Sequence, residues 1–181
     1  MNEREKPFVQ VLLDLLRQKK MHIATAESCT GGMIAASLTA IAGSSDVVNG
    51  GVVSYTNEIK HKVLGVKTET LEKFSAVSEE CTREMAEGAA KLLNAEAAVS
   101  VSGIAGPTGG TEIQPVGTVC FGFYVNGTLS SVTKLFMGDR SNVRREAALF
   151  AMQTLLEKLR RDMSSYASFF RDTVKIQIIF L

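Results

Sequence analysis

The residues best suited to covalent chemistry lie together at 25–32, where the sequence is TAESCTGG. Three side chains in this stretch, Ser28, Cys29 and Thr30, carry a hydroxyl or a thiol that can serve as a nucleophile. An apolar run precedes the stretch and predicts a buried strand, and apolar residues at helical spacing follow it. Such a junction turns free helix N–H groups and the positive end of the helix dipole toward the turn. The stretch therefore predicts a nucleophile beside oxyanion donors, and the alternative is an ordinary Ser or Thr helix cap.

A lysine is the expected general base for Ser28, because the sequence offers no competent histidine–acid pair for that serine. Lys60 lies about one helical turn into the segment after a predicted strand, and Tyr55 is placed to relay a proton or to orient the lysine. Burial and neighbouring cations both disfavour an ammonium group, so a lysine in a partly dry, electropositive pocket is biased toward the neutral amine. Such an amine can take the serine proton and return it to a leaving amine. Lys62 is the second choice, and a solvated surface charge is the alternative reading of a single lysine.

Cys29 is predicted to be a packing residue first and a nucleophile second. A thiol at a helix N-terminus is easily made reactive, but a cysteine hydrolase also needs an imidazole. His22 is expected at the far end of the preceding strand, and His61 is expected on the surface. A Cys29 enzyme therefore stays open as an alternative to a Ser28 enzyme.

A glycine-rich loop and two arginines are candidates for holding an anion. The loop at 103–110, GIAGPTGG, offers successive N–H groups that could form an anion-binding nest, although it lacks the pattern of a P-loop or a dinucleotide fingerprint. Arg140 and Arg144 lie four residues apart at the start of a predicted helix, so both could clamp a phosphate, whereas Arg145 points elsewhere. A plain connecting loop and a solvated helix face are the alternatives.

The elements that must position these residues alternate between strand and helix. This pattern predicts a layered α/β/α domain with a mixed sheet, because an Asn-Gly pair at 126–127 predicts an antiparallel hairpin. Ligands collect at the carboxyl ends of strands in such sheets, and polar or glycine-rich segments follow three strands, at 27–32, 55–61 and 103–110. We expect helices at 5–20, 33–41, 57–64, 68–74, 78–93 and 140–161, and strands at 21–24, 47–56, 95–102, 115–125 and 128–137.

Composition narrows the class of protein. The chain has 181 residues, 45% hydrophobic and 22% charged, which predicts one compact globular domain. A net charge of +1 provides no broad basic field for nucleic acid, and no apolar run is long enough to span a membrane. Three cysteines far apart in sequence, with two histidines, suit neither a disulfide framework nor a transition-metal site. We expect a cytoplasmic protein without a cofactor.

The end of the chain fits this scheme less well. Residues 1–161 are assigned to the catalytic domain and residues 162–181 to an extra tail. The segment at 175–181 is apolar and β-prone, so it is expected either to add an edge strand or to be a poorly ordered appendage.

A series of motifs completes the pattern: TAESCTGG at 25–32, IAGSS at 41–45, YTNEIK at 55–60, AVSE at 76–79, SGIAGPTGG at 102–110, PVGTV at 115–119, GDR at 138–140 and RR at 144–145. In this order they resemble the CinA C-terminal domain family over about residues 5–160. Many relatives carry a molybdopterin-binding-like domain before this one. Few residues precede the first predicted helix here, so the stand-alone form is expected.

The resemblance implies a nicotinamide mononucleotide deamidase of the PncC type, which forms nicotinate mononucleotide and ammonia in pyridine nucleotide salvage. It places the catalytic serine on Ser28 and the lysine on Lys60, with Tyr55 alongside. It also implies a homo-oligomer acting on a small molecule, with neither nucleic acid nor membrane as partner. The expected substrate-binding residues are Glu27, Thr30, Gly31, Gly32, Asn57, Gly103, Ala105, Gly106, Thr108, Arg140 and Arg144. N–H groups around Thr30 and Gly31 are expected to receive the oxyanion. A nucleotide-binding regulatory module without turnover is the competing hypothesis.

Overall fold

A single sheet forms the centre of the molecule, in a computed structural model that describes the backbone of residues 6–179 and the side chains of residues 7–161. Its strand order is β2-β1-β3-β4-β5. The first three strands are parallel to one another, β4 pairs antiparallel with β3, and β5 pairs antiparallel with β4. The strands are β1 (Ile23–Glu27), β2 (Val48–Val53), β3 (Ala97–Gly103), β4 (Thr118–Val125) and β5 (Thr128–Leu135). The predicted mixed sheet is confirmed.

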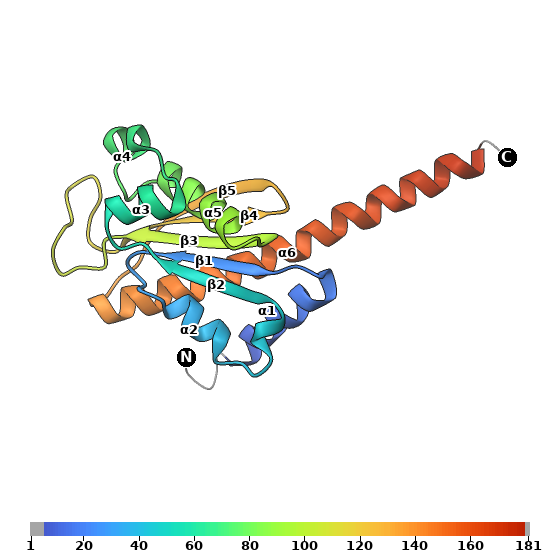
Figure 1. Ribbon diagram of the computed structural model, residues 1–181, viewed down its shortest axis with the longest axis horizontal. Coiled ribbons are helices and arrows are strands. Elements are labelled where there is room, and N and C mark those ends of the chain that lie inside the picture. Colours follow the sequence, from blue (N-terminus) through green and yellow to red (C-terminus); the bar gives the residue numbers. More distant parts are fainter. Residues whose placement is uncertain (1–5, 180–181) are drawn as a thin grey trace.

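Helices cover both faces of the sheet, which gives the predicted α/β/α layers (Figure 1). Two hydrophobic clusters lie on either side, one built with α1, α2 and α6 and the other with α3 and α5. The short α4 packs against α5. The helices are α1 (Lys6–Lys19), α2 (Met33–Thr39), α3 (Asn57–Leu64), α4 (Thr68–Phe74), α5 (Glu79–Leu92) and α6 (Arg140–Ile179), with a 3-10 turn at Ser44–Asp46.

Local signals in the sequence account for several element boundaries. Asn126 and Gly127 have φ of 47° and 85°, the left-handed pair that a tight hairpin requires, and they join β4 to β5. The Ser78 hydroxyl accepts the N–H of Cys81 and caps α5, and the Asp139 carboxylate accepts the N–H of Asn142 at the start of α6. The predicted hairpin is confirmed.

One of the two expectations for the end of the chain, an edge strand, is wrong for the described residues. Residues 175–179, expected as an edge strand or a poorly ordered appendage, belong to α6, which runs from Arg140 to Ile179. Neither glycine nor proline occurs in that span, so the helical hydrogen-bond ladder is not interrupted. Residues 180–181 lie outside the described part of the chain. Within that part, none of the helices combines the length and apolar character needed to cross a bilayer.

The parallel strands bring three loops to one edge of the sheet. The carboxyl ends of β1, β2 and β3 lie at the left of Figure 1, beside the loop at 104–117 and the first turns of α6. The polar segments predicted to gather at strand ends therefore share this edge.

Candidate active site

Ser28 and Lys60 meet at the carboxyl edge of the sheet. The Lys60 Nζ atom lies 3.1 Å from Ser28 Oγ and donates a hydrogen bond of 2.8 Å to the backbone carbonyl of Ser54. Lys60 is 1% exposed and Ser28 is 8% exposed. A nucleophilic hydroxyl and an amine base are thus within proton-transfer distance.

Burial tunes the lysine for the role of a base. Removal from water lowers the pKa of Lys60 below its ordinary value, because the ammonium form loses its hydration. The described part of the chain records no carboxylate hydrogen-bonded to the Lys60 amine. The amine is positioned by α3, whose first turn is capped by the Thr56 hydroxyl accepting the N–H of Ile59. The lysine therefore has a fixed place and a bias toward the neutral form.

The backbone around Ser28 forms a tight turn between β1 and α2. The N–H of Ser28 donates to the carbonyl of Val101 at 2.9 Å, which extends the β1–β3 pairing by one residue. The N–H of Gly31 donates back to the carbonyl of Ser28 at 3.1 Å. Gly31 and Gly32 have φ of 60° and 93°, conformations that glycine adopts without steric cost. Ser28 is thereby held at the tip of the strand.

Glu27, which was expected to bind the substrate, is bonded to backbone N–H groups of the protein instead. Its carboxylate is 1% exposed and accepts three N–H groups, from Gly32 at 3.0 Å, Ile34 at 3.1 Å and Ala35 at 2.9 Å. These donors form the N-terminus of α2, which was expected to face the reacting anion. An internal carboxylate occupies them because buried N–H groups require acceptors. Glu27 and Gly32 therefore stabilise the turn.

The two arginines predicted to clamp a phosphate, Arg140 and Arg144, contact different loops. Arg144 donates from Nε to the carbonyl of Cys29 at 3.0 Å and from a terminal nitrogen to the carbonyl of Thr30 at 2.9 Å. Arg140 donates to the carbonyl of Gly106 at 2.8 Å and to the Tyr55 hydroxyl at 3.0 Å. Together they link the loops that follow all three parallel strands. Arg145, expected to point elsewhere, contacts Asn142 and Glu146.

Tyr55 lies at the rim of the site. Its side chain is 59% exposed, and its hydroxyl accepts the hydrogen bond from Arg140. Within the described part of the chain, the structure records no hydrogen bond from Tyr55 to Ser28 or Lys60. In this structure Tyr55 therefore contacts the arginine and not the proposed base.

The other predicted residues lie at the same edge of the sheet, Asn57 at the start of α3 and Gly103 at the end of β3. Ala105 is buried, Thr108 and Asn57 are exposed, and Gly103 ends β3 against the backbone of Thr118 and Val119. Lys62, the second choice for the base, pairs at 2.6 Å with Glu58 on the outer surface of α3. Its position identifies it as a surface charge.

The thiol alternative has little physical support in this geometry. Burial raises the pKa of Cys29 to about 12, so the thiol is protonated at neutral pH. His22 bonds to Glu96 at the opposite end of β1, and the His61 ring is 2.8 Å from the carbonyl of Val66. Neither imidazole is recorded in contact with Cys29 within the described residues.

Two backbone carbonyls that hold the candidate site in place were not predicted. The carbonyl of Ser54 anchors the Lys60 amine, and the carbonyl of Val101 anchors the Ser28 backbone. Ser54 directly follows β2, so its position at a strand end was the signal that could have identified it. Backbone carbonyls are present in every residue, so residue type alone does not show which of them accepts a hydrogen bond at the site.

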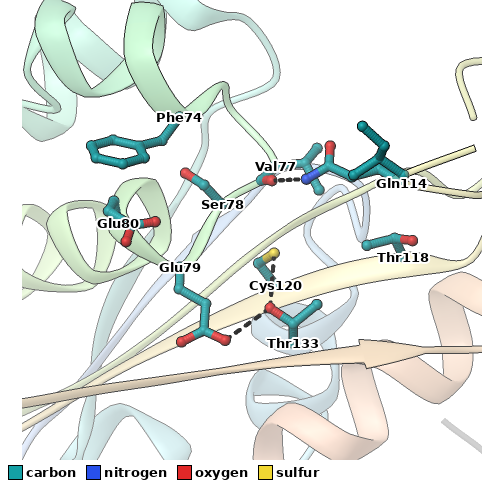
Figure 2. Close-up of a pocket in the computed structure, with 10 residues that line it drawn as sticks. Phe74, Val77, Ser78, Glu79, Glu80, Gln114, Thr118, Cys120 and Thr133 are labelled. Atoms are coloured by element: carbon teal, nitrogen blue, oxygen red, sulfur yellow. Dashed lines mark hydrogen bonds between the residues drawn. The ribbon is translucent and has the colours of Figure 1, made fainter. Parts of the chain in front are cut away.

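A separate hollow lies away from these residues, beside the start of α5 (Figure 2). It has a volume of about 420 Å³. Glu79 accepts a hydrogen bond of 2.9 Å from Thr133 there, and the Gln114 amide donates to the carbonyl of Val77 at 2.8 Å. The second bond ties the loop at 104–117 to the segment between α4 and α5. Across the described residues, no group of three or more His, Cys, Asp or Glu side chains is arranged to hold a metal ion.

Comparison with known proteins supplies the family. The family model described as the CinA C-terminal domain matches residues 5–159. A CinA-like protein of Thermotoga neapolitana is 46% identical over 156 residues, 86% of this chain and 38% of the relative. One from Kosmotoga olearia is 50% identical over 149 residues, 82% of this chain and 36% of the relative. The chain thus spans less than two fifths of the length of these curated relatives.

Solved structures agree in fold over nearly their whole length. A CinA superfamily protein from Klebsiella pneumoniae superposes with a TM-score of 0.84 at 39% identity, covering 89% of this chain and 99% of that one. A CinA superfamily protein from Escherichia coli gives 0.82 at 34% identity, covering 86% and 92%. With the family model matching most of its residues, the chain belongs to the CinA C-terminal domain family.

Proposed function

We propose that the protein is an amidohydrolase that converts nicotinamide mononucleotide to nicotinate mononucleotide and ammonia, in pyridine nucleotide salvage. The observation that carries the proposal is the buried contact of 3.1 Å between Ser28 Oγ and Lys60 Nζ. The family resemblance supplies the substrate, and the residues supply a route for the chemistry. The arrangement also contains an exposed arginine that is suited to a phosphate.

In the first half-reaction, Ser28 Oγ attacks the carboxamide carbon and its proton moves to the neutral Lys60 amine. The Ser54 carbonyl accepts an N–H of Lys60, which leaves the nitrogen lone pair for the serine proton. The resulting tetrahedral oxyanion collapses, the C–N bond breaks and Lys60 returns the proton to the leaving nitrogen. Ammonia departs, and an ester joins Ser28 to the pyridine carboxyl carbon.

The second half-reaction repeats the proton transfers with water. Lys60 takes a proton from the incoming water, whose oxygen attacks the ester carbon. The ester C–O bond then breaks and the proton passes to Ser28 Oγ. Nicotinate mononucleotide is released, and both residues return to their starting states. Lys60 thus serves as both base and acid in each half-reaction.

Arg140 is the proposed ligand for the ribose phosphate. Its side chain is exposed and joins Tyr55 to the Gly106 backbone, so its remaining N–H groups face solvent near two strand ends. Arg144, by contrast, is committed to two backbone carbonyls. Exposed Asn57 and Thr108 lie at the same edge of the sheet and complete a polar rim for the ribose.

The test is to incubate the purified protein with nicotinamide mononucleotide in the presence of a chelator and to measure ammonia and nicotinate mononucleotide together. We expect equal amounts of both products. Ser28→Ala and Lys60→Ala should each lower kcat by at least about 10³-fold, because removal of the nucleophile or its base disables the same step. Cys29→Ala is the matched control and should keep its activity.

Other outcomes have distinct meanings. Activity in Ser28→Ala together with loss in Cys29→Ala would transfer the nucleophile to the thiol. Binding of nicotinamide mononucleotide without release of ammonia would contradict the enzyme and favour a regulatory nucleotide-binding module.

A further inference from the structure

We infer that Arg144 is a positioning residue that presents the Thr30 N–H group as an oxyanion donor of the site. This inference rests on the proposed amide hydrolysis. The starting observation is that one guanidinium group donates to two successive carbonyls, those of Cys29 and Thr30, from a residue more than a hundred positions away. The planar guanidinium of arginine can donate to two carbonyls in a fixed geometry, whereas the ammonium of lysine is a point charge without that fork.

Most donors of the turn are already occupied. The N–H of Ser28 donates to Val101, and the N–H of Gly31 donates to the carbonyl of Ser28. The N-terminus of α2 donates to the buried Glu27 carboxylate through Gly32, Ile34 and Ala35. From Ser28 to Gly32, only the N–H groups of Cys29 and Thr30 have no acceptor within the described part of the chain.

The geometry of the peptide bond connects Arg144 to one of these donors. In a trans peptide the C=O and the following N–H point in opposite directions. Arg144 holds the Cys29 carbonyl at 3.0 Å, so the Thr30 N–H of the same peptide is directed to the opposite side. A hydrogen bond to the carbonyl also polarises the peptide group and strengthens its N–H as a donor. Arg144 thereby acts on the oxyanion through the backbone.

Gly31 contributes to the same contact between Arg144 and the turn. Its φ of 60° is a left-handed conformation, and an added Cβ would lie 3.2 Å from the Arg144 guanidinium. A side chain at position 31 would therefore be strained by the backbone conformation and would press on the guanidinium that bonds both carbonyls. This explains Gly31 by its contact with Arg144, whereas the sequence predicted that it donates to the oxyanion.

Substitutions of Arg144 and Arg140 should therefore differ in their effects on two substrates, nicotinamide mononucleotide and nicotinamide riboside. The riboside lacks the phosphate. Arg144→Ala should lower kcat by about 10²- to 10³-fold on both substrates, with KM changed by less than about threefold, because the lost interaction belongs to the transition state. Arg140→Ala should raise KM for the mononucleotide and leave the riboside reaction much less affected. Arg145→Ala, one position further along the helix, is the control that should keep both parameters.

A rescue experiment separates positioning from simple loss of structure. Millimolar guanidinium should restore part of kcat in Arg144→Ala and should have no such effect on Ser28→Ala. Arg144→Lys should remain impaired, because an ammonium cannot hold both carbonyls in the same fork. If the alanine variant does not fold, the kcat and KM of Arg144→Lys decide the question.

The results that would overturn the inference are specific. A rise in KM confined to the mononucleotide, with kcat preserved in Arg144→Ala, would assign Arg144 to the phosphate instead. Full activity of Arg144→Lys, or the absence of guanidinium rescue in a folded Arg144→Ala, would also overturn it. Lack of ammonia release by the unsubstituted protein would overturn the proposed function itself, and the oxyanion role with it.

Discussion

At the scale of single residues, burial acts in opposite senses on the two candidate reactive groups, Lys60 and Cys29. The low-polarity surroundings disfavour whichever form is charged. For Lys60 that form is the ammonium, so burial favours a base, and for Cys29 it is the thiolate, so burial suppresses a nucleophile. The same environment therefore favours the proposed pair of Ser28 and Lys60 over a Cys29 nucleophile.

The lowered pKa of Lys60 predicts the pH dependence of the reaction. The neutral amine is the active form, so kcat/KM should rise with pH along a limb whose midpoint lies below the ordinary lysine pKa of about 10.4. The measurement is kcat/KM against pH for ammonia release. A rate that rises only at or above the ordinary lysine value would contradict the assignment.

The same group links stability to pH. Between the folded and the unfolded pKa of Lys60, the unfolded chain binds more protons, so the free energy of unfolding should increase as the pH rises through that interval. Lys60→Met has no titrating amine and should lack this contribution. Urea unfolding of both proteins at several pH values gives the comparison.

At the scale of elements, the position of Lys60 depends on close contact between α3 and α5. Gly88 of α5 faces the end of α3, and an added Cβ there would overlap the carbonyl oxygen of Leu64. The absence of a side chain at this point lets α3 approach the sheet and extend Lys60 toward Ser28. The α6 helix contributes in a similar way, since its first turns hold the loops after all three parallel strands.

Gly88→Ala should destabilise the protein even though alanine is the better helix former. Its helix propensity favours the change by about 1 kcal/mol, but overlap with backbone that cannot move freely costs about 1–3 kcal/mol. Urea unfolding should therefore show a net loss of stability, together with lower kcat if α3 shifts. A gain in stability would contradict the packing argument.

Gly65→Ala is the comparison for that experiment. Open space surrounds Gly65, but its φ is 69°, so alanine there costs about 1–2 kcal/mol through backbone strain alone. We expect stability to fall in this variant without the loss of kcat, because no contact with α5 changes.

At the scale of the whole molecule, the family match ends well before the end of α6. The family match ends at residue 159, and Leu159 is fully buried in the core. Beyond this point α6 continues past the sheet (Figure 1). The residues assigned to the site all lie between Glu27 and Arg144. The catalytic unit is therefore expected to be independent of the final segment.

Truncation after Arg161 tests this division. The shortened chain should keep kcat within about twofold and its free energy of unfolding within about 0.5 kcal/mol, since the core and site contacts remain. The measurements are ammonia release and urea unfolding beside the full chain. Loss of folding or of turnover would show that the final segment belongs to the functional domain.

Much of the fold was predictable because its signals are local. Apolar periodicity and the Asn126-Gly127 pair act on neighbouring residues, and each predicted its element. The family motifs and the strand-end rule also predicted that Ser28 and Lys60 would meet, as they do at 3.1 Å. The long α6 was missed because β-propensity at its end was weighed without the uninterrupted helix before it.

By itself, the sequence determined the order of the elements, the class of the fold and the choice of Ser28 and Lys60 as candidate residues, since these follow from residue types, short spacings and family motifs. Only the tertiary structure decided how donors and acceptors are shared. Glu27 takes the α2 N-terminus, and Arg144 takes two carbonyls more than a hundred residues away. Buried polar groups accept the partners that packing brings near them, and those partners come from distant parts of the chain that local pattern cannot relate.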